Sequence, residues 1–90
     1  MKILSVCGMG IGTSVLLKMN AEKVLEAMGV QAEVVAADIT KAKRDGEGAD
    51  IILTTPELVV LLEGMPGKIV PIEHVFDLTE IRQKLTAALL

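Results

Sequence analysis

The fold of this chain is indicated by its opening stretch, KILSVCGMGIGTS (residues 2–14). Lys2–Val6 is a short, largely apolar run of strand length, and the glycine-rich segment Cys7–Gly12 follows it directly. From Thr13 the apolar side chains recur with helical spacing as far as Gly29, a residue typical of helix ends. A buried strand, a glycine-rich turn and a helix in this order are typical of a parallel α/β sheet.

The remainder of the chain repeats this alternation of strand and helix. Further strands are predicted at Ala32–Ala37, Asp50–Leu53 and Lys68–Ile72, and further helices within Thr40–Gly48, from Thr55 to Glu63 and from Asp77 to Leu90. Short connections of this kind require parallel strands joined by right-handed crossovers. We predict one α/β domain over residues 1–90, a small doubly wound, flavodoxin-like sheet of four parallel strands in the order 2-1-3-4. Pro71 favours a sheet edge for the fourth strand, because proline cannot donate a ladder hydrogen bond.

Capping patterns mark the starts of the two later helices. Thr55, which precedes a proline, is typical of an N-cap residue. Asp77 is predicted to cap the last helix, with Glu80 completing a capping box and Phe76 packing onto Ile81.

Composition and charge exclude several classes of function. Hydrophobic residues make up 51% of the chain and charged residues 23%, with one aromatic side chain, so neither disorder nor a base-stacking surface is expected. A net charge of −3 argues against nucleic acid binding. The apolar runs are far shorter than the roughly 20 residues of a membrane span, and the first residues lack the apolar stretch of a signal peptide, so we expect a cytoplasmic protein. The single cysteine excludes an internal disulfide and a multi-cysteine metal site, and we expect no metal and no cofactor.

The segment between the first strand and the first helix has the chemistry of a phosphate site. In doubly wound sheets the ligand lies beyond the carboxyl ends of the strands, which is where this segment falls. Its alternate glycines allow a tight turn with inward N–H groups, and the helix start adds unpaired N–H groups. The predicted cradle consists of Gly8, Met9, Gly10, Ile11, Gly12, Thr13 and Ser14. Donors that hold a phosphate also stabilise a thiolate, so Cys7 is predicted to be a nucleophile with a lowered pKa.

Other phosphate-binding patterns fit these residues less well. A Walker loop requires a lysine that the segment lacks. A dinucleotide fingerprint requires a glycine where Thr13 stands, although Asp38 resembles the ribose-binding acid of that fold. The main alternative is a low-molecular-weight cysteine phosphatase or arsenate reductase, whose Cys-x5-Arg pattern supplies an arginine that clamps the phosphoryl oxygens. Thr13 occupies that arginine position. A cysteine that accepts a phosphoryl group without this clamp suits a carrier.

Three segments carry a resemblance to a known family: Lys2–Met19 with its VCGMGIGTS core, ADIILTT at residues 49–55, and the final helix from Asp77. They resemble the IIB components of the bacterial phosphoenolpyruvate-dependent sugar phosphotransferase system (PTS), most closely the ascorbate- and galactitol-type branch. The lactose and cellobiose IIB proteins are more distant relatives with the same fold and cysteine.

The resemblance implies a phosphorelay with two partners. A phosphohistidine on a IIA protein would phosphorylate Cys7. The phosphocysteine would then phosphorylate a sugar or polyol bound by the membrane-embedded IIC component during uptake. By position, Gly8 through Ser14 would cradle the phosphoryl group.

Three residues outside the loop are further candidates. His74 is the only histidine, but it follows the fourth strand, two strands away from Cys7, so a surface position is favoured over a role in proton transfer. Thr54 and Thr55 follow the third strand, next to the first, and one of their hydroxyls could shape the wall of the site. Helix capping is the favoured interpretation for Thr55.

Overall fold

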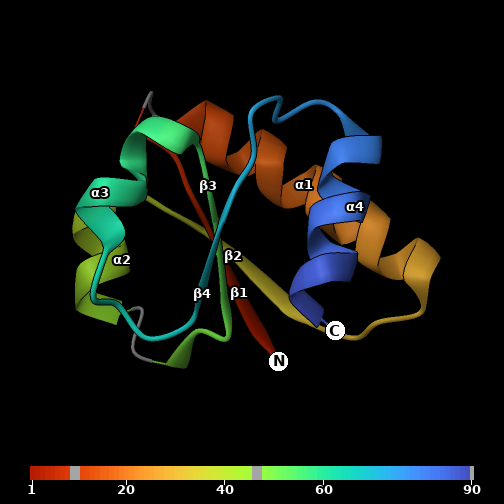
Figure 1. Ribbon diagram of the computed structural model, residues 1–90, viewed down its shortest axis with the longest axis horizontal. Coiled ribbons are helices and arrows are strands. Elements are labelled where there is room, and N and C mark those ends of the chain that lie inside the picture. The colour runs from red at the N-terminus through yellow and green to blue at the C-terminus, as the bar shows by residue number, and fades with distance from the viewer. Residues whose placement is uncertain (9–10, 46–47, 90) are drawn as a thin grey trace.

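The computed structural model describes residues 1–8, 11–45 and 48–89, and it contains a four-stranded parallel sheet with helices on both faces (Figure 1). The strands are β1 (Lys2–Val6), β2 (Glu33–Ala37), β3 (Ile51–Thr54) and β4 (Lys68–Pro71). The helices are α1 (Ile11–Met28), α2 (Ile39–Asp45), the 3-10 helix η2 (Pro56–Leu58), α3 (Val59–Leu62) and α4 (Leu78–Leu89). The strand order β2-β1-β3-β4 confirms the predicted topology and places Pro71 on an edge strand.

Side-chain alternation along β1 divides the core between the two faces of the sheet. Ile3 packs in a cluster with residues of α1 and α4, including Leu17 and Leu85. Leu4 packs on the other face, in a cluster that includes Leu62 of α3 and also residues of α2. Figure 1 shows the same division, with α1 and α4 on one side of the strands and α2 and α3 on the other.

The carboxyl ends of the strands meet at one edge of the sheet, the upper edge in Figure 1. Val6, the last residue of β1, is paired with Ala37 of β2 and Thr54 of β3. The Thr54 hydroxyl donates a 2.8 Å hydrogen bond to the Val6 carbonyl, and the Ser5 hydroxyl donates one of 2.8 Å to the Ser14 carbonyl in α1. These two buried bonds fix the end of β1 against β3 and against the first turns of α1.

Helix α1 begins two residues before its predicted start at Thr13. It starts at Ile11, so Gly12 and Thr13 lie in its first turn. The predicted start lies too far along the chain because helical periodicity is recognised from apolar side chains, and the glycine-rich segment has few of them. The helix ends where predicted, at Gly29, whose φ of 73° is the left-handed conformation that glycine adopts without strain. No helix within the described residues is long and apolar enough to cross a membrane.

The start of α4 is only partly as predicted. Asp77 caps the helix, because its Oδ1 accepts hydrogen bonds from the N–H groups of Thr79 (3.0 Å) and Glu80 (3.2 Å). The predicted capping box is wrong, because the Glu80 carboxylate instead accepts hydrogen bonds from the backbone N–H groups of Glu73 and His74, at 2.7 and 2.8 Å. The chain ahead of the helix thus folds back over the Glu80 side chain.

The predicted packing of Phe76 onto Ile81 is also wrong. Phe76 is 70% exposed, and its ring meets that of His74 edge-on with centroids 6.0 Å apart. Ile81 is fully buried without it. The turn that wraps around Glu80 directs Phe76 outward, and local spacing alone does not reveal this.

A close approach of two backbone segments precedes β4. Gly67 has a φ of 100°, and a Cβ at this position would lie 2.6 Å from the carbonyl oxygen of Ala49. Only glycine combines this conformation with this contact. The approach sets the start of β4 beside the chain that enters β3, where Lys68 N–H donates to the Asp50 carbonyl at 2.9 Å.

Candidate functional site

Cys7 lies at the carboxyl edge of the sheet, directly after β1. It is 2% exposed and packs in the apolar cluster that β1 shares with α1 and α4. Chain connections leave in opposite directions from the neighbouring strands β1 and β3, so this is the point of the sheet where doubly wound folds bind their ligands.

The predicted phosphate cradle consists in part of a helix terminus. Gly8 is exposed beside Cys7, whereas Gly12, Thr13 and Ser14 belong to the beginning of α1, with Ser14 buried. The first N–H groups of a helix lack partners within the helix, and with the positive end of the dipole they favour an anion. Met9 and Gly10 lie outside the described residues, as does the side chain of Ile11.

The chain that follows β3 forms a wall beside this loop. A Cβ built on Gly8 would lie 3.1 Å from Cδ2 of Leu58, the last residue of η2. This distance is shorter than an ordinary van der Waals contact, so a larger residue at position 8 would displace the Leu58 side chain. In Figure 1, η2 lies at the upper edge of the sheet, close to the end of β1 and the start of α1.

The thiol of Cys7 is less acidic than the sequence predicts. Burial raises its pKa from 9.0 to about 11, and the negative charge of Glu57 in η2 acts in the same direction. The predicted lowering of this pKa is therefore wrong. The physical reason is that apolar neighbours disfavour a thiolate and the carboxylate repels it. At neutral pH Cys7 is a protonated thiol, which must lose its proton when it reacts.

Thr55 lies at the N-cap position of η2, with an extended backbone (φ −94°, ψ 154°), but its hydroxyl makes no capping hydrogen bond. The prediction is therefore confirmed for the position of Thr55 at the start of η2 and wrong for its side chain. Its Oγ1 is buried and has no hydrogen-bond partner within the described part of the chain. The neighbouring Thr54 hydroxyl, by contrast, is bound to the Val6 carbonyl. The Thr54 hydroxyl therefore stabilises the end of β1, and the Thr55 hydroxyl has no partner among the described residues.

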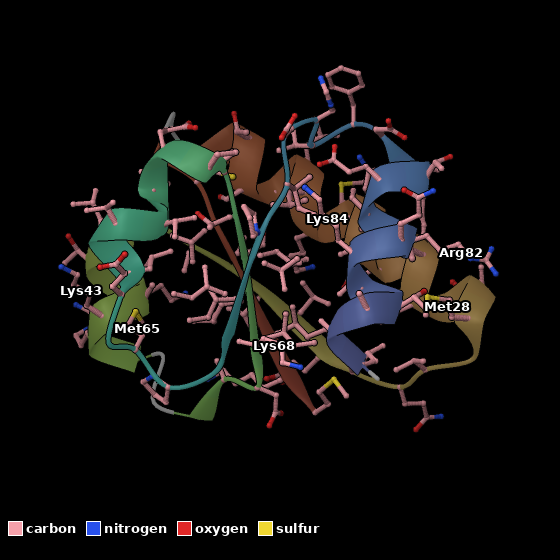
Figure 2. The ribbon with its side chains drawn as sticks, in the orientation of Figure 1. Met28, Lys43, Met65, Lys68, Arg82 and Lys84 are labelled. Atoms are coloured by element: carbon pink, nitrogen blue, oxygen red, sulfur yellow. The ribbon has the colours of Figure 1, made fainter. Side chains whose placement is uncertain are left out.

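The residues that the alternative functions require lie elsewhere or have other roles. Asp38, the candidate ribose-binding acid, caps α2 by accepting the Lys41 N–H at 2.7 Å. The chain has two arginines. Arg44 lies in the last turn of α2, a crossover helix that runs back from the carboxyl edge. Arg82 lies on α4, on the opposite side of the molecule from α2 and α3 (Figure 2), where it lines a shallow groove beside Lys23 of α1.

His74 is exposed after β4, separated from β1 by β3 in the sheet, as predicted. Its Nδ1 lies 3.3 Å from Oε1 of Glu80. His74, Asp77 and Glu80 bring ligand-type atoms within 4.8 Å of one another. However, Asp77 caps α4, and Glu80 accepts two backbone N–H groups and the Lys84 ammonium at 2.7 Å. These carboxylates already have donors, and the cluster is a structural one.

Sequence analysis does not identify Glu57 and Leu58 as site residues. Their local pattern, a proline followed by Glu57 and Leu58, is that of an ordinary helix start. The signal that could have found them is topological: in the order 2-1-3-4 the end of β3 lies beside the end of β1, so residues after β3 face the loop that follows Cys7.

Two sequence comparisons agree with this arrangement. The family model described as "PTS system, Lactose/Cellobiose specific IIB subunit" matches residues 2–87. The chain is also 34% identical over 88 residues to the ascorbate-specific PTS system EIIB component of Mycoplasma pneumoniae, an alignment that covers 97% of this chain and 93% of that protein. Both matches include the whole of the loop and the wall beside it.

Solved structures show the same fold. The lactose-specific IIB component domain of the phosphoenolpyruvate:carbohydrate phosphotransferase system from Streptococcus pneumoniae superposes with a TM-score of 0.65 at 20% identity, covering 99% of this chain and 90% of that chain. Primo-1 superposes with a TM-score of 0.55 at 16% identity, covering 97% of this chain and 92% of that chain. At these identities the likeness concerns the fold alone.

Proposed function

The chain belongs to the lactose/cellobiose-type IIB subunits of the PTS and is therefore a phosphotransferase of sugar uptake; on this premise we propose that Cys7 carries the phosphoryl group. The observation that supports the proposal is the position of the only cysteine, at the carboxyl edge between the end of β1 and the N-terminus of α1. Gly8 through Ser14 form the cradle, in which backbone N–H groups and the helix terminus bind the phosphoryl oxygens.

In the first step the donor is a phosphohistidine of a IIA protein. The Cys7 sulfur attacks phosphorus, the P–N bond breaks and a P–S bond forms. The thiol proton ends on the imidazole nitrogen that leaves. Because the thiolate is the nucleophile, Cys7, whose pKa is about 11, gives up its proton as the P–S bond forms.

In the second step the acceptor is a hydroxyl of a substrate bound by the membrane-embedded IIC component. The hydroxyl oxygen attacks phosphorus, the P–S bond breaks, and the hydroxyl proton returns to sulfur. The Mycoplasma pneumoniae relative is named for ascorbate, and this supports an ascorbate-like substrate here over the galactitol-like one that the sequence motif also allows. The protein acts at the cytoplasmic face of the membrane, where it meets both partners.

The positions of the arginines support a carrier over the alternative cysteine phosphatase or arsenate reductase. Such enzymes bind the oxygens of the phosphoryl or arsenate group with an arginine in the loop, whereas here Thr13 stands at that position. Arg44 and Arg82 lie on the outer helices α2 and α4. A phosphocysteine without this clamp persists long enough to be passed to the second partner.

The test is intact mass spectrometry after incubation with phosphoenolpyruvate, the general phosphotransfer proteins and a panel of IIA proteins. Wild type is expected to gain one phosphoryl group, and Cys7→Ser none. Circular dichroism of Cys7→Ser checks that the fold is retained. Turnover of an aryl phosphate, or of arsenate in the presence of a thiol reductant, without any stable adduct, would favour the phosphatase or the arsenate reductase instead.

A further inference from the structure

Thr55 carries a buried hydroxyl for which the fold provides no partner. Its Oγ1 is the one buried side-chain nitrogen or oxygen without a hydrogen bond among the residues that the structure describes. Buried polar atoms are paired in the large majority of cases, and an unpaired one destabilises the folded state. Such a hydroxyl is available to a ligand that lies beside it.

The register of the sheet places Thr55 beside Cys7. Val6 of β1 is paired with Thr54 of β3, so the residues that directly follow the two parallel strands are Cys7 and Thr55. Thr55 keeps an extended backbone, and side chains alternate along extended chain. Its side chain therefore leaves the sheet on the same face as Leu53, which belongs to the same core cluster as Cys7.

A second contact holds this segment against the loop. Leu58, three residues beyond Thr55, lies next to Gly8 and is buried. The Leu58 N–H also donates a 3.0 Å hydrogen bond to the Thr55 carbonyl. The position of Thr55 is thus fixed on one side by the Thr54–Val6 hydrogen bond and on the other by η2.

We propose that the Thr55 hydroxyl donates a hydrogen bond to the phosphoryl group on Cys7, as a phosphoryl-binding residue contributed by the segment that follows β3. This inference rests on the proposed phosphocysteine. It adds to the cradle a side chain that lies outside the Cys7–Ser14 loop. The hydroxyl exchanges no proton and forms no bond to phosphorus. It binds the charge that the phosphoryl oxygens carry, without the net positive charge of an arginine.

A neutral donor is suited to a group that must be both accepted and released. Charge-assisted clamping by arginine binds the phosphoryl oxygens strongly and stabilises the transition state for hydrolysis. A hydroxyl orients the same oxygens with a weaker bond. In this site it also compensates in part for Glu57, whose negative charge acts on Cys7 and would repel a phosphoryl group there.

The test compares Thr55→Val, which removes the hydroxyl and keeps the shape, with Thr55→Ser, which keeps the hydroxyl. Thr86→Val is the control, since Thr86 is exposed on α4 and its hydroxyl donates to the Arg82 carbonyl of the same helix at 2.7 Å. Thr55→Val is expected to accept the phosphoryl group from phospho-IIA on the order of tenfold more slowly, the loss typical of one hydrogen bond to a charged group. Thr55→Ser and Thr86→Val should stay within about twofold of wild type.

Two further readouts separate this role from a structural one. The melting temperature of Thr55→Val should equal or exceed that of wild type, because the variant removes an unpaired buried hydroxyl. The phosphorus NMR signal of phosphocysteine should shift in Thr55→Val and not in Thr86→Val. Transfer to Thr55→Val at the wild-type rate would overturn the inference, as would a Thr55→Ser variant as slow as Thr55→Val or a lowered melting temperature of Thr55→Val.

The outcomes also distinguish this inference from the function on which it rests. If wild type accepts no phosphoryl group from any donor, the proposed function fails and the role of Thr55 fails with it. If wild type and Thr55→Val are phosphorylated equally fast, the carrier function stands and only the role of Thr55 is rejected.

Discussion

The effect of Glu57 on Cys7 leads to a quantitative prediction for Glu57→Gln. The pKa of Cys7 is raised by about 2, from 9.0 to about 11, with burial as the larger cause and Glu57 as the smaller one. The smaller cause accounts for less than half of the rise. Removal of the carboxylate charge should therefore lower the pKa of Cys7 by the smaller part of this rise while leaving the burial in place. The pKa falls in the variant because the negative charge of Glu57 no longer repels the Cys7 thiolate.

The pH dependence of alkylation by iodoacetamide measures this shift. Between pH 7 and 9 the thiolate fraction is proportional to the acid dissociation constant, so a full unit would increase it tenfold. The nucleophilicity of a thiolate falls as its pKa falls, which reduces the expected gain in rate to about threefold at most. Glu63→Gln is the matched control, because Glu63 is an exposed glutamate just after α3. An unchanged alkylation rate between pH 7 and 9 in Glu57→Gln, or an equal gain in Glu63→Gln, would refute the reasoning.

Two further predictions concern stability and are measured by urea denaturation. Gly67→Ala should lose at least about 2 kcal/mol of unfolding free energy, because an alanine cannot keep both the positive φ and the 2.6 Å approach to the Ala49 carbonyl oxygen. Gly48→Ala is the control and should change the stability little, because the space around its Cβ is open. Similar losses in both variants would show that the close approach is not the cause. Thr54→Val should lose about 1–3 kcal/mol, because it leaves the buried Val6 carbonyl without the Thr54 hydroxyl. A Thr54→Val variant as stable as wild type would mean that this bond contributes nothing to the junction of β1 and β3.

The two threonines after β3 show how neighbouring residues of one type can have separate roles. Thr54 stabilises the sheet at the point where the site is built, and its variants should act through stability. Thr55 is expected to act through the phosphoryl group, and its variants should act through rate. The opposite expectations for Thr54→Val and Thr55→Val make the pair an internal comparison: one lowers stability, and the other slows transfer without lowering stability.

Much of the architecture followed from the sequence by itself. The alternation of short apolar runs with helical periodicity defined the strands and helices, and the crossover rule then left the order 2-1-3-4 as the natural arrangement. The glycine-rich segment located Cys7 at the carboxyl edge, because backbone freedom and helix starts are local properties of the chain. The cap at Asp77 and the helix end at Gly29 are local in the same sense, and both were predicted correctly.

Tertiary structure decided what depends on contacts between distant segments. The pKa of Cys7 was predicted to fall because the adjacent donors are visible in the sequence, but it rises because the apolar neighbours and Glu57 come from other elements. Phe76 and Glu80 do not make their predicted contacts with Ile81 and with the backbone of Asp77, because the turn after β4 folds around the Glu80 side chain. The free hydroxyl of Thr55 likewise depends on the pairing of β1 with β3. Periodicity and capping describe a chain and its nearest turn, whereas desolvation and unpaired hydrogen bonds are properties of the packed molecule.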